Sequence, residues 1–219
     1  MVHAVLFDFG NTLFAHESLA NTVQRAAAEL GHEVDADWAA AAAADIERAA
    51  HSADELRHQR DLDERVWSQR WRVLYAARDA EVPGLGAVIH GLMHDPAAWV
   101  PYARTAEVLR ALSDAGMPVG LVSNTGWDVR TVFRHQSLAH LVQSFTLSYE
   151  AGVVKPSAEI FRVACASLGV EPRDALMVGD DPVADAGAVR VGMPTLLLPA
   201  QAVGTDNGLE GVCALSMRR

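Results

Sequence analysis

The stretch AVLFDFGNTL, residues 4–13, joins an apolar run to a polar turn. Ala4 to Phe7 are apolar or β-prone, a single carboxylate follows at Asp8, and the sequence GNT then favours a turn with polar contacts. This pattern predicts a buried strand over Ala4–Phe9 that ends in a functional site.

From residue 104 onward, strand and helix patterns alternate. Short apolar runs predict strands at 118–123, 144–148, 175–179 and 195–198. The segments between them have helical periodicity. This rhythm predicts an α/β fold, a doubly wound parallel sheet that also includes the first strand. The expected helices are Thr105–Ala115, Asp128–His135, Ala158–Leu168 and Val183–Val191.

Residues 15–97 have a different texture, rich in Ala, Arg, Glu, His and Trp at helical spacing. We therefore expect an all-helical domain, 15–97, inserted into a core made of residues 1–14 and 98–219. The expected helices of the insertion are Glu17–Leu30, Ala36–Ala50, Leu62–Arg78 and Gly84–Met93.

Composition narrows the class of protein. The chain has 219 residues, 50% hydrophobic and 21% charged, with a net charge of −10. An acidic chain without a basic run is a poor partner for nucleic acid, whose phosphates require clustered Lys and Arg. Cys165 and Cys213 have neither disulfide nor zinc spacing, and no apolar stretch has the length of a membrane span. We expect a cytoplasmic monomer or homodimer with no membrane partner.

Ligands of such a sheet bind at the carboxyl ends of its strands. The sequence places carboxylates, hydroxyls, an amide and one lysine at these ends. That set suits a phosphoryl group or another anionic electrophile, because it offers a nucleophile, donors for oxygens and carboxylates for Mg²⁺. The residues concerned are Asp8, Asn11, Thr12, Ser123, Asn124, Thr125, Lys155, Asp180, Asp181 and Asp185.

Four stretches carry a resemblance to a known family. FDFGNTL (7–13), VSNTG (122–126), VVKPS (153–157) and VGDDPVAD (178–185) resemble, in order and spacing, the four motifs of the haloacid dehalogenase (HAD) superfamily. The helical insertion resembles the C1-type cap of that family. The resemblance implies a Rossmann-like core, hydrolase activity and a small, anionic substrate.

The resemblance also implies a role for each matching residue. Asp8 would be the covalent nucleophile, and Thr12 would support its loop. Ser123 and Asn124 would donate to the transferred group, and Lys155 would balance its charge. For Mg²⁺, the implied ligands are Asp8, the backbone carbonyl of Gly10 and Asp180, with Asp181 and Asp185 as further residues of the metal site.

Position 10 departs from the family's phosphatases, which have a second Asp there as general acid and base. Gly10 has no side chain that could act as an acid or a base. General acid and base catalysis typically raises a rate by about 10²- to 10⁴-fold. Three interpretations follow: a Mg²⁺-dependent phosphatase without its usual acid, a 2-haloacid dehalogenase, whose halide leaves without a proton, or a catalytically weakened binding or regulatory protein. The phosphatase is favoured, because the metal-binding Asp180 is retained.

Substrate identity is expected to depend on the helical insertion and its surroundings. Our candidates for contacts with the substrate or for gating are His16, which is also a candidate proton donor, Trp127 beside the second motif, and Arg57 and Arg60 in a polar stretch between helices. Trp67 and Trp71, four residues apart, are expected to pack within the insertion.

Overall fold

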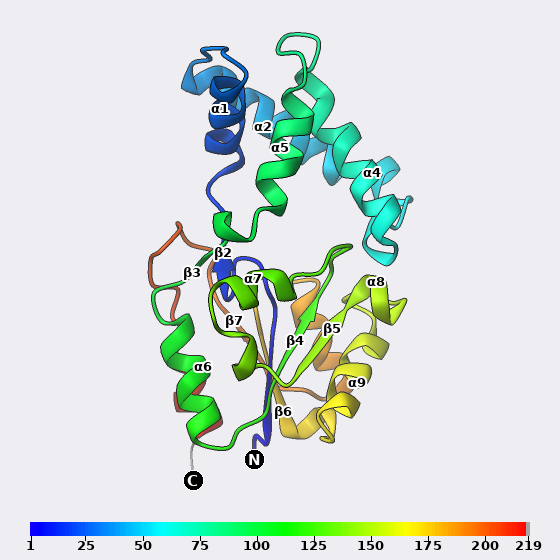
Figure 1. Ribbon diagram of the computed structural model, residues 1–219. Coiled ribbons are helices and arrows are strands. Elements are labelled where there is room, and N and C mark those ends of the chain that lie inside the picture. Colours follow the sequence, from blue (N-terminus) through cyan, green and yellow to red (C-terminus); the bar gives the residue numbers. More distant parts are fainter. Residues whose placement is uncertain (218–219) are drawn as a thin grey trace.

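A parallel five-stranded sheet forms the lower half of the molecule in Figure 1, a computed structural model that describes residues 1–217. The strand order β5-β4-β1-β6-β7 places β1 at the centre. Every pairing within this sheet is parallel, which confirms the predicted fold class. The strands are β1 (Ala4–Phe7), β4 (Val119–Ser123), β5 (Ser144–Leu147), β6 (Ala175–Gly179) and β7 (Thr195–Leu197).

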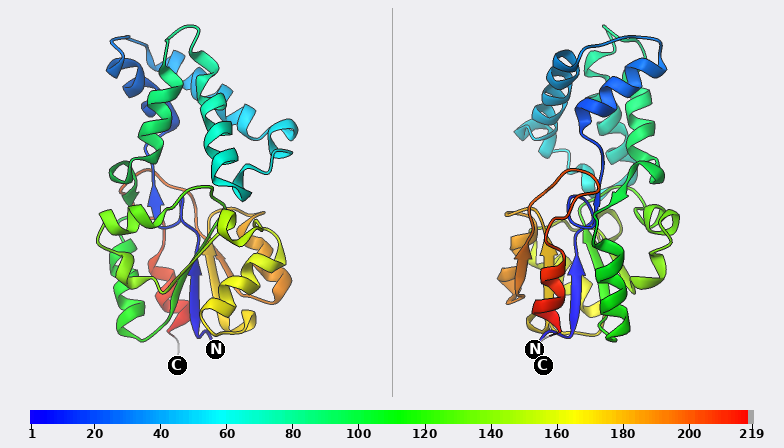
Figure 2. Two further views of the ribbon diagram at one scale, coloured as in Figure 1. Left: turned by 45° about the vertical axis from the view of Figure 1, so that its right-hand side comes forward. Right: turned by 90° about the vertical axis from the view of Figure 1, so that its left-hand side faces the viewer.

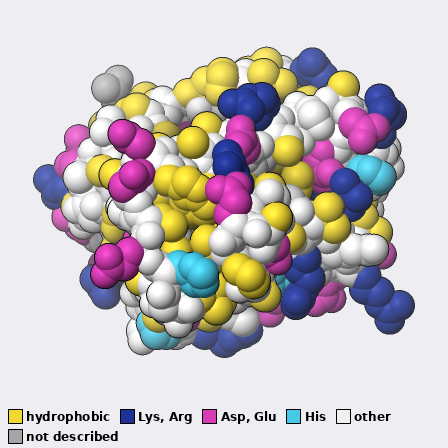
Figure 3. Space-filling model, turned by 90° about the horizontal axis from the view of Figure 1, so that it is seen from above, with side chains coloured by type: hydrophobic (Ala, Val, Ile, Leu, Met, Phe, Trp, Pro, Cys, Tyr) yellow, Lys and Arg dark blue, Asp and Glu magenta, His cyan; other side chains and the backbone are white. Residues whose placement is uncertain are grey.

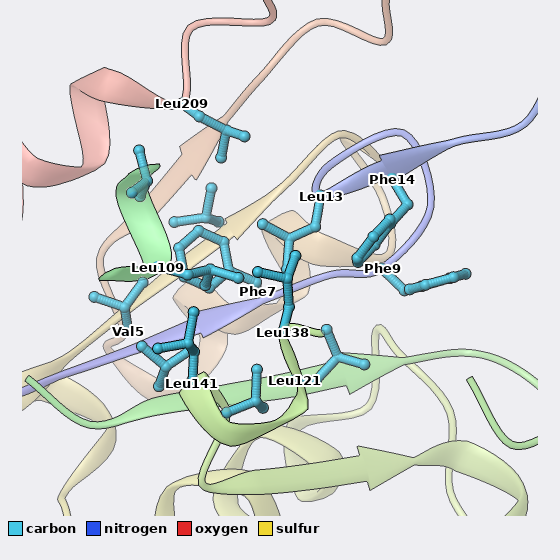
Figure 4. Packing of buried hydrophobic residues seen from close by; sticks show 14 of the residues in the cluster. Val5, Phe7, Phe9, Leu13, Phe14, Leu109, Leu121, Leu138, Leu141 and Leu209 are labelled. Carbon is cyan, nitrogen blue, oxygen red and sulfur yellow. The ribbon is translucent and has the colours of Figure 1, made fainter. Parts of the chain in front are cut away.

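Strand β1 is buried on both faces because its side chains alternate between two hydrophobic clusters. Val5 and Phe7 belong to the cluster on one face, and Ala4 and Leu6 to the cluster on the other. Figure 4 shows the first of these clusters, in which Phe7 is surrounded by side chains from several elements. The first face is covered by α6 (Thr105–Asp114), α7 (Arg130–His135) and α10 (Glu210–Ser216), and the second by α9 (Ala158–Ser167).

The helices between residues 19 and 98, which we call the helical segment, stand above the carboxyl edge of the sheet (Figure 2). They enclose a hydrophobic cluster of their own, with Val23, Ile46 and Ile89 fully buried. Both connections to the sheet pass through an antiparallel pair, β2 (Phe14–Ala15) and β3 (Val100–Pro101). The elements are α1 (Leu19–Glu29), α2 (Ala36–Ala50), α3 (Ala53–Leu56), η1 (Arg60–Leu62), α4 (Glu64–Tyr75), η2 (Ala76–Arg78), α5 (Leu85–His94) and η3 (Pro96–Ala98).

Several predicted helices differ from those observed by two or three residues at an end; α1 begins at Leu19 rather than Glu17, and α7 at Arg130 rather than Asp128. The helix predicted over Leu62–Arg78 begins only at Glu64, because the Asp63 side chain accepts from the next backbone N–H groups and caps it. The segment predicted as a helix over Val183–Val191 is a 3₁₀ helix, η6 (Asp185–Val191). Gly187 brings its backbone so close to Pro156 that an added Cβ would lie 2.5 Å from the Pro156 Cβ. The first strand also ends two residues earlier than predicted, at Phe7.

The outer face of the helical segment carries charges of both signs. Figure 3, which looks down on this face, shows basic and acidic side chains interspersed with apolar ones. Within residues 1–217, no helix combines the length and apolar character needed to cross a bilayer.

Two histidines of α5 lie one helical turn apart, His90 buried and His94 partly buried beside Trp127. The rings of His90 and His94 stack with their centroids 4.1 Å apart, and His90 is only 8% exposed. Burial, with contributions from His94 and Arg72, lowers the pKa of His90 to about 4. The folded protein therefore holds His90 neutral in a range where an exposed histidine would be charged.

We predict that Phe7→Ala lowers the free energy of unfolding by about 3 to 5 kcal/mol, because it leaves a cavity beside the central strand. Urea denaturation followed by circular dichroism measures this change. Val163→Ala on α9, where the side chain is 41% exposed, is the control and should change stability by less than about 0.5 kcal/mol. Equal effects of the two substitutions would contradict the packing described for β1.

We also predict a pH-dependent contribution of His90. The pKa of His90 in the folded chain lies below its value in the unfolded chain. Between these two values, the unfolded chain binds a proton at His90 and the folded chain does not. Stability contributed by neutral His90 is complete above pH 6.5 and is lost towards pH 4, by up to about 3 kcal/mol. His90→Gln should flatten this part of the stability profile, whereas His32→Gln at an exposed position should not. Superimposable profiles for wild type and His90→Gln would refute the prediction.

Candidate active site

The carboxyl ends of the three central strands bring the predicted site residues together. Asp8 directly follows β1, Ser123 ends β4 and Asp180 directly follows β6. Because β1 lies between β4 and β6, these three side chains meet at one edge of the sheet. The backbone N–H of Asp8 donates to the carbonyl of Val178, which fixes the start of its loop against β6.

A buried lysine holds two carboxylates at the centre of the site. The Lys155 Nζ lies 2.5 Å from Asp8 Oδ1 and 2.6 Å from Asp185 Oδ1. The Lys155 and Asp185 side chains are almost completely buried, and that of Asp8 is 12% exposed. Burial alone would lower the pKa of Lys155, but the two carboxylates raise it to about 12, so the ammonium stays charged.

Asp185 holds both Lys155 and the backbone after β6 in position. One of its oxygens accepts from Lys155, and the other accepts from the backbone N–H groups of Asp180 and Asp181, both at 3.0 Å. Its carboxylate occupies the space that a side chain on Gly179 would need, since an added Cβ there would lie 2.1 Å from Asp185 Oδ2. Glycine at position 179 is therefore required for this arrangement.

The predicted metal residues separate into two groups. Asp8, Asp180 and Asp185 each offer a carboxylate oxygen within 4.8 Å of the others. Asp181 does not join this group within the described part of the chain. Its Oδ1 accepts from the N–H groups of Val183 and Ala184 and so closes the turn before η6.

The negative charge of these three carboxylates suits the binding of a divalent cation. Burial and the neighbours Asp185 and Asp180 raise the pKa of Asp8 to about 7, although Lys155 opposes the shift. Burial and Asp185 also raise the pKa of Asp180. Three carboxylates share one ammonium, and oxygen ligands of this kind are those that Mg²⁺ prefers. A bound cation would relieve the repulsion and keep Asp8 ionised.

Around this centre, the other predicted residues take distinct positions. The Asn124 amide accepts from the Lys155 N–H at 2.8 Å and donates to the Lys155 carbonyl at 3.0 Å, so it holds the backbone of the lysine. Ser123 lines the cavity above Asp8. The buried Thr12 directs its Oγ1 toward Asp180 Oδ1 at 3.5 Å. Gly10 lines the same cavity, and its metal-ligand role stays a prediction.

A cavity of about 390 Å³ lies between this centre and the helical segment. Its upper wall is largely aromatic. Trp67 contacts the loop after β4 so closely that a Cβ on Gly126 would lie 2.2 Å from the Trp67 Cβ. The Arg60 guanidinium lies 4.8 Å from the centre of the Trp71 ring. The lining residues from the helical segment and its exit are Arg60, Asp61, Trp67, Trp71, Tyr75, Met93 and Trp99.

Two of the four substrate or gating candidates, Arg60 and Trp127, line the cavity. The Arg57 side chain is 70% exposed and pairs with Asp54 of the preceding helix α3, so the structure places it outside the described site. The His16 nitrogens face the carbonyls of Glu17 at 3.1 Å and Leu92 at 3.4 Å, which directs them away from the cavity.

Several lining residues were missed by the sequence analysis. Trp67 and Trp71, expected to pack within the insertion, line the cavity, and Trp71 also contacts the hydrophobic cluster of the helical segment. Tyr75 follows on the same helical face, so the four-residue spacing of these rings was an available signal. Asp61 had no such signal, because nothing in its local sequence indicates that it faces the sheet.

Known proteins resemble this chain over most of its length. A ribulose-1,5-bisphosphate 5-phosphatase of Halopiger xanaduensis is 29% identical over 90% of this chain and 84% of its own length. A glyceraldehyde 3-phosphate phosphatase of Methanopyrus kandleri is 31% identical over 90% of this chain and 83% of its own. Other relatives align over a part only: a hydrolase of Schizosaccharomyces pombe is 36% identical over 78 residues, 34% of that protein.

A solved structure of a dehalogenase has the same fold. It superimposes with a TM-score of 0.73 at 21% identity, over 100% of this chain and 98% of its own. The haloacid dehalogenase-like hydrolase family matches residues 2–191, which include the helical segment, all four motifs and every strand of the sheet except β7. The chain therefore belongs to the haloacid dehalogenase-like hydrolases.

Proposed function

We propose that this hydrolase is a Mg²⁺-dependent phosphatase that transfers the phosphoryl group of a small anionic phosphomonoester to Asp8. The observation that carries the proposal is the buried group formed by Lys155 with Asp8 and Asp185, beside Asp180. Two relatives that align over most of this chain are named as phosphatases, which supports the same class of reaction.

The chain's own residues divide the work of the reaction. Asp8 Oδ attacks phosphorus as the bond to the leaving oxygen breaks, and water then hydrolyses the aspartyl-phosphate. Lys155 stays charged and neutralises phosphoryl oxygens, and Ser123 donates to them. Asp8 and Asp180 would hold Mg²⁺, which when bound neutralises charge on the phosphoryl group. Asn124 and Asp185 keep Lys155 in position.

The dehalogenase is the second candidate, because Gly10 supplies no acid and a halide needs none. The excess of carboxylates over ammonium groups at the site argues against a dehalogenase that works without a metal. Asp8, Asp180 and Asp185 face the single ammonium of Lys155, and without a bound cation the surplus negative charge favours protonation of Asp8 and weakens it as a nucleophile.

We further propose that residues 15–97, the inserted domain expected from the sequence, act as a cap that closes over Asp8. The contact of Trp67 with the Gly126 backbone and the aromatic wall would exclude water from the cavity.

The test of the proposed reaction is phosphate release from a panel of phosphomonoesters and acyl phosphates, measured with Mg²⁺ and with a chelator. Asp8→Asn should lower turnover by about 10⁴-fold or more, because it removes the nucleophile. Removal of Mg²⁺ should abolish release. Asp114→Asn at an exposed position is the control. Release that persists in Asp8→Asn would refute the proposal, and halide release from 2-haloacids without metal would favour the second candidate.

Closure of the cap is tested by Gly126→Ala. The added methyl group needs the space occupied by Trp67, so the helical segment must shift away from the site. We expect kcat/KM for phosphate esters to fall by about 10- to 100-fold, with little change in urea stability. Gly211→Ala, where an added Cβ meets nothing within 4 Å, is the matched control. Unchanged kinetics in Gly126→Ala would contradict the role of this contact.

A further inference from the structure

Proton transfer lacks an obvious source in this site. Gly10 carries no side chain, although there is room for one, since an added Cβ would lie 3.8 Å from Trp99 Cζ3. The ring nitrogens of His16 face backbone carbonyls. Without an acid, an alkoxide leaving group would depart unprotonated, at a cost of about 10² to 10⁴ in rate.

We propose that Asp61, on the short helix η1 of the helical segment, is the general acid and base of the reaction. This inference rests on the proposed phosphatase function. Asp61 lines the same cavity as Asp8, but it comes from the helical segment, whereas Asp8 comes from the carboxyl edge of the sheet. A phosphomonoester bound with its phosphorus against Asp8 has its leaving oxygen on the far side from the nucleophile, toward the helical segment.

The backbone of Asp61 is tied to the core beside the site. The Ser148 hydroxyl donates to the Asp61 carbonyl at 2.6 Å and accepts from the N–H of Thr125 at 2.9 Å. Thr125 follows Ser123 and Asn124 in the loop after β4. Trp67, next to η1, packs on the Gly126 backbone of that same loop. These contacts place Asp61 at the edge of the sheet that carries the nucleophile.

The surroundings of Asp61 suit a group that gives and takes a proton. Burial raises the pKa of its carboxyl group, while Arg60 and a hydrogen bond from the Trp67 side chain oppose the rise. The Arg60 Nε lies 3.9 Å from Asp61 Oδ1, close enough to stabilise the carboxylate once the proton has left. A carboxyl group with a raised pKa retains its proton nearer to neutral pH.

Other groups along the cavity fit this role less well. Asp185 is occupied by Lys155 and by backbone N–H groups, and Asp181 caps its own turn. Burial raises the pKa of Tyr75 far above neutral, so its phenol is a poor base for the second step. Among the lining residues that the structure describes, Asp61 is the one carboxyl group that the helical segment contributes.

The two half-reactions then balance. In the first, Asp8 Oδ forms a bond to phosphorus, the bond from phosphorus to the leaving oxygen breaks, and the Asp61 proton moves to that oxygen to give an alcohol. In the second, the Asp61 carboxylate takes a proton from water as the water oxygen attacks phosphorus. The bond between phosphorus and Asp8 breaks, phosphate leaves, and Asp61 is again protonated.

The test is Asp61→Asn, assayed on β-glycerol phosphate, which has a poor leaving group, and on p-nitrophenyl phosphate, which has a good one. We expect kcat/KM for β-glycerol phosphate to fall by about 10²-fold or more. For p-nitrophenyl phosphate, kcat/KM should hold within about threefold, because this leaving group needs little protonation. In the same variant, p-nitrophenol should appear in a burst, because aspartyl-phosphate accumulates when its hydrolysis lacks a base.

Two further variants distinguish the loss of a proton-transfer group from a disturbance of the structure around Asp61. Asp63→Asn makes the same change two residues away, at an exposed helix cap that Asn also supports, and should behave as wild type. Gly10→Asp in the Asp61→Asn background should restore turnover of β-glycerol phosphate, because an added Cβ at position 10 meets only Trp99, at 3.8 Å, and Asp there supplies a carboxyl group beside the nucleophile.

An equal loss for both substrates, no loss for either, or a loss that Gly10→Asp does not restore would overturn the role of Asp61. If the proposed phosphatase function itself is wrong, the result is different: the wild type would release no more phosphate than Asp8→Asn.

Discussion

The site depends on one buried ammonium group, that of Lys155, held between Asp8 and Asp185. A buried charge is tolerated only when it is paired and hydrogen-bonded. The surrounding residues meet this condition: Asn124 fixes the backbone of the lysine, and Gly179 leaves room for Asp185. Without the Lys155 ammonium, the buried carboxylates of Asp8 and Asp185 would lose the positive charge that they share.

The two halves of the molecule contribute different chemistry to the cavity. The sheet side supplies charges in fixed positions, because Asp8 and Asp180 directly follow buried strands and the backbone of Lys155 is held by Asn124 after β4. The helical segment supplies aromatic rings and the pair Arg60 and Asp61. In the proposed reaction, the first side handles the phosphoryl group and the second handles the leaving group.

The sheet and its edge could be predicted because local signals there agree with one another. Buried runs such as Ala4–Phe7 end in polar residues, and the order of strands brings those ends together. Asp181 and Asp185 could not be distinguished, since both follow the same strand and differ only in where their side chains turn. Asp61 could not be placed, because its position beside the cavity follows from how the helical segment packs on the loop after β4. The predicted helix over Val183–Val191 failed for a similar reason, since contact of Gly187 with Pro156 is long-range in sequence.

The ribbon formed by β2 and β3 links the two halves in an unusual way. Two separate linkers would let the helical segment tilt in many directions, but here the linkers are paired with each other and must bend together. The ribbon also reaches into the nucleophile loop: the N–H of Phe14 donates to the Phe9 carbonyl, and the N–H of Asn11 donates to the Phe14 carbonyl. Backbone hydrogen bonds thus join the ribbon directly to the loop that carries Asp8. If the proposed cap moves about this ribbon, the movement is transmitted to the backbone next to Asp8, which would couple access to the cavity with the position of the proposed nucleophile.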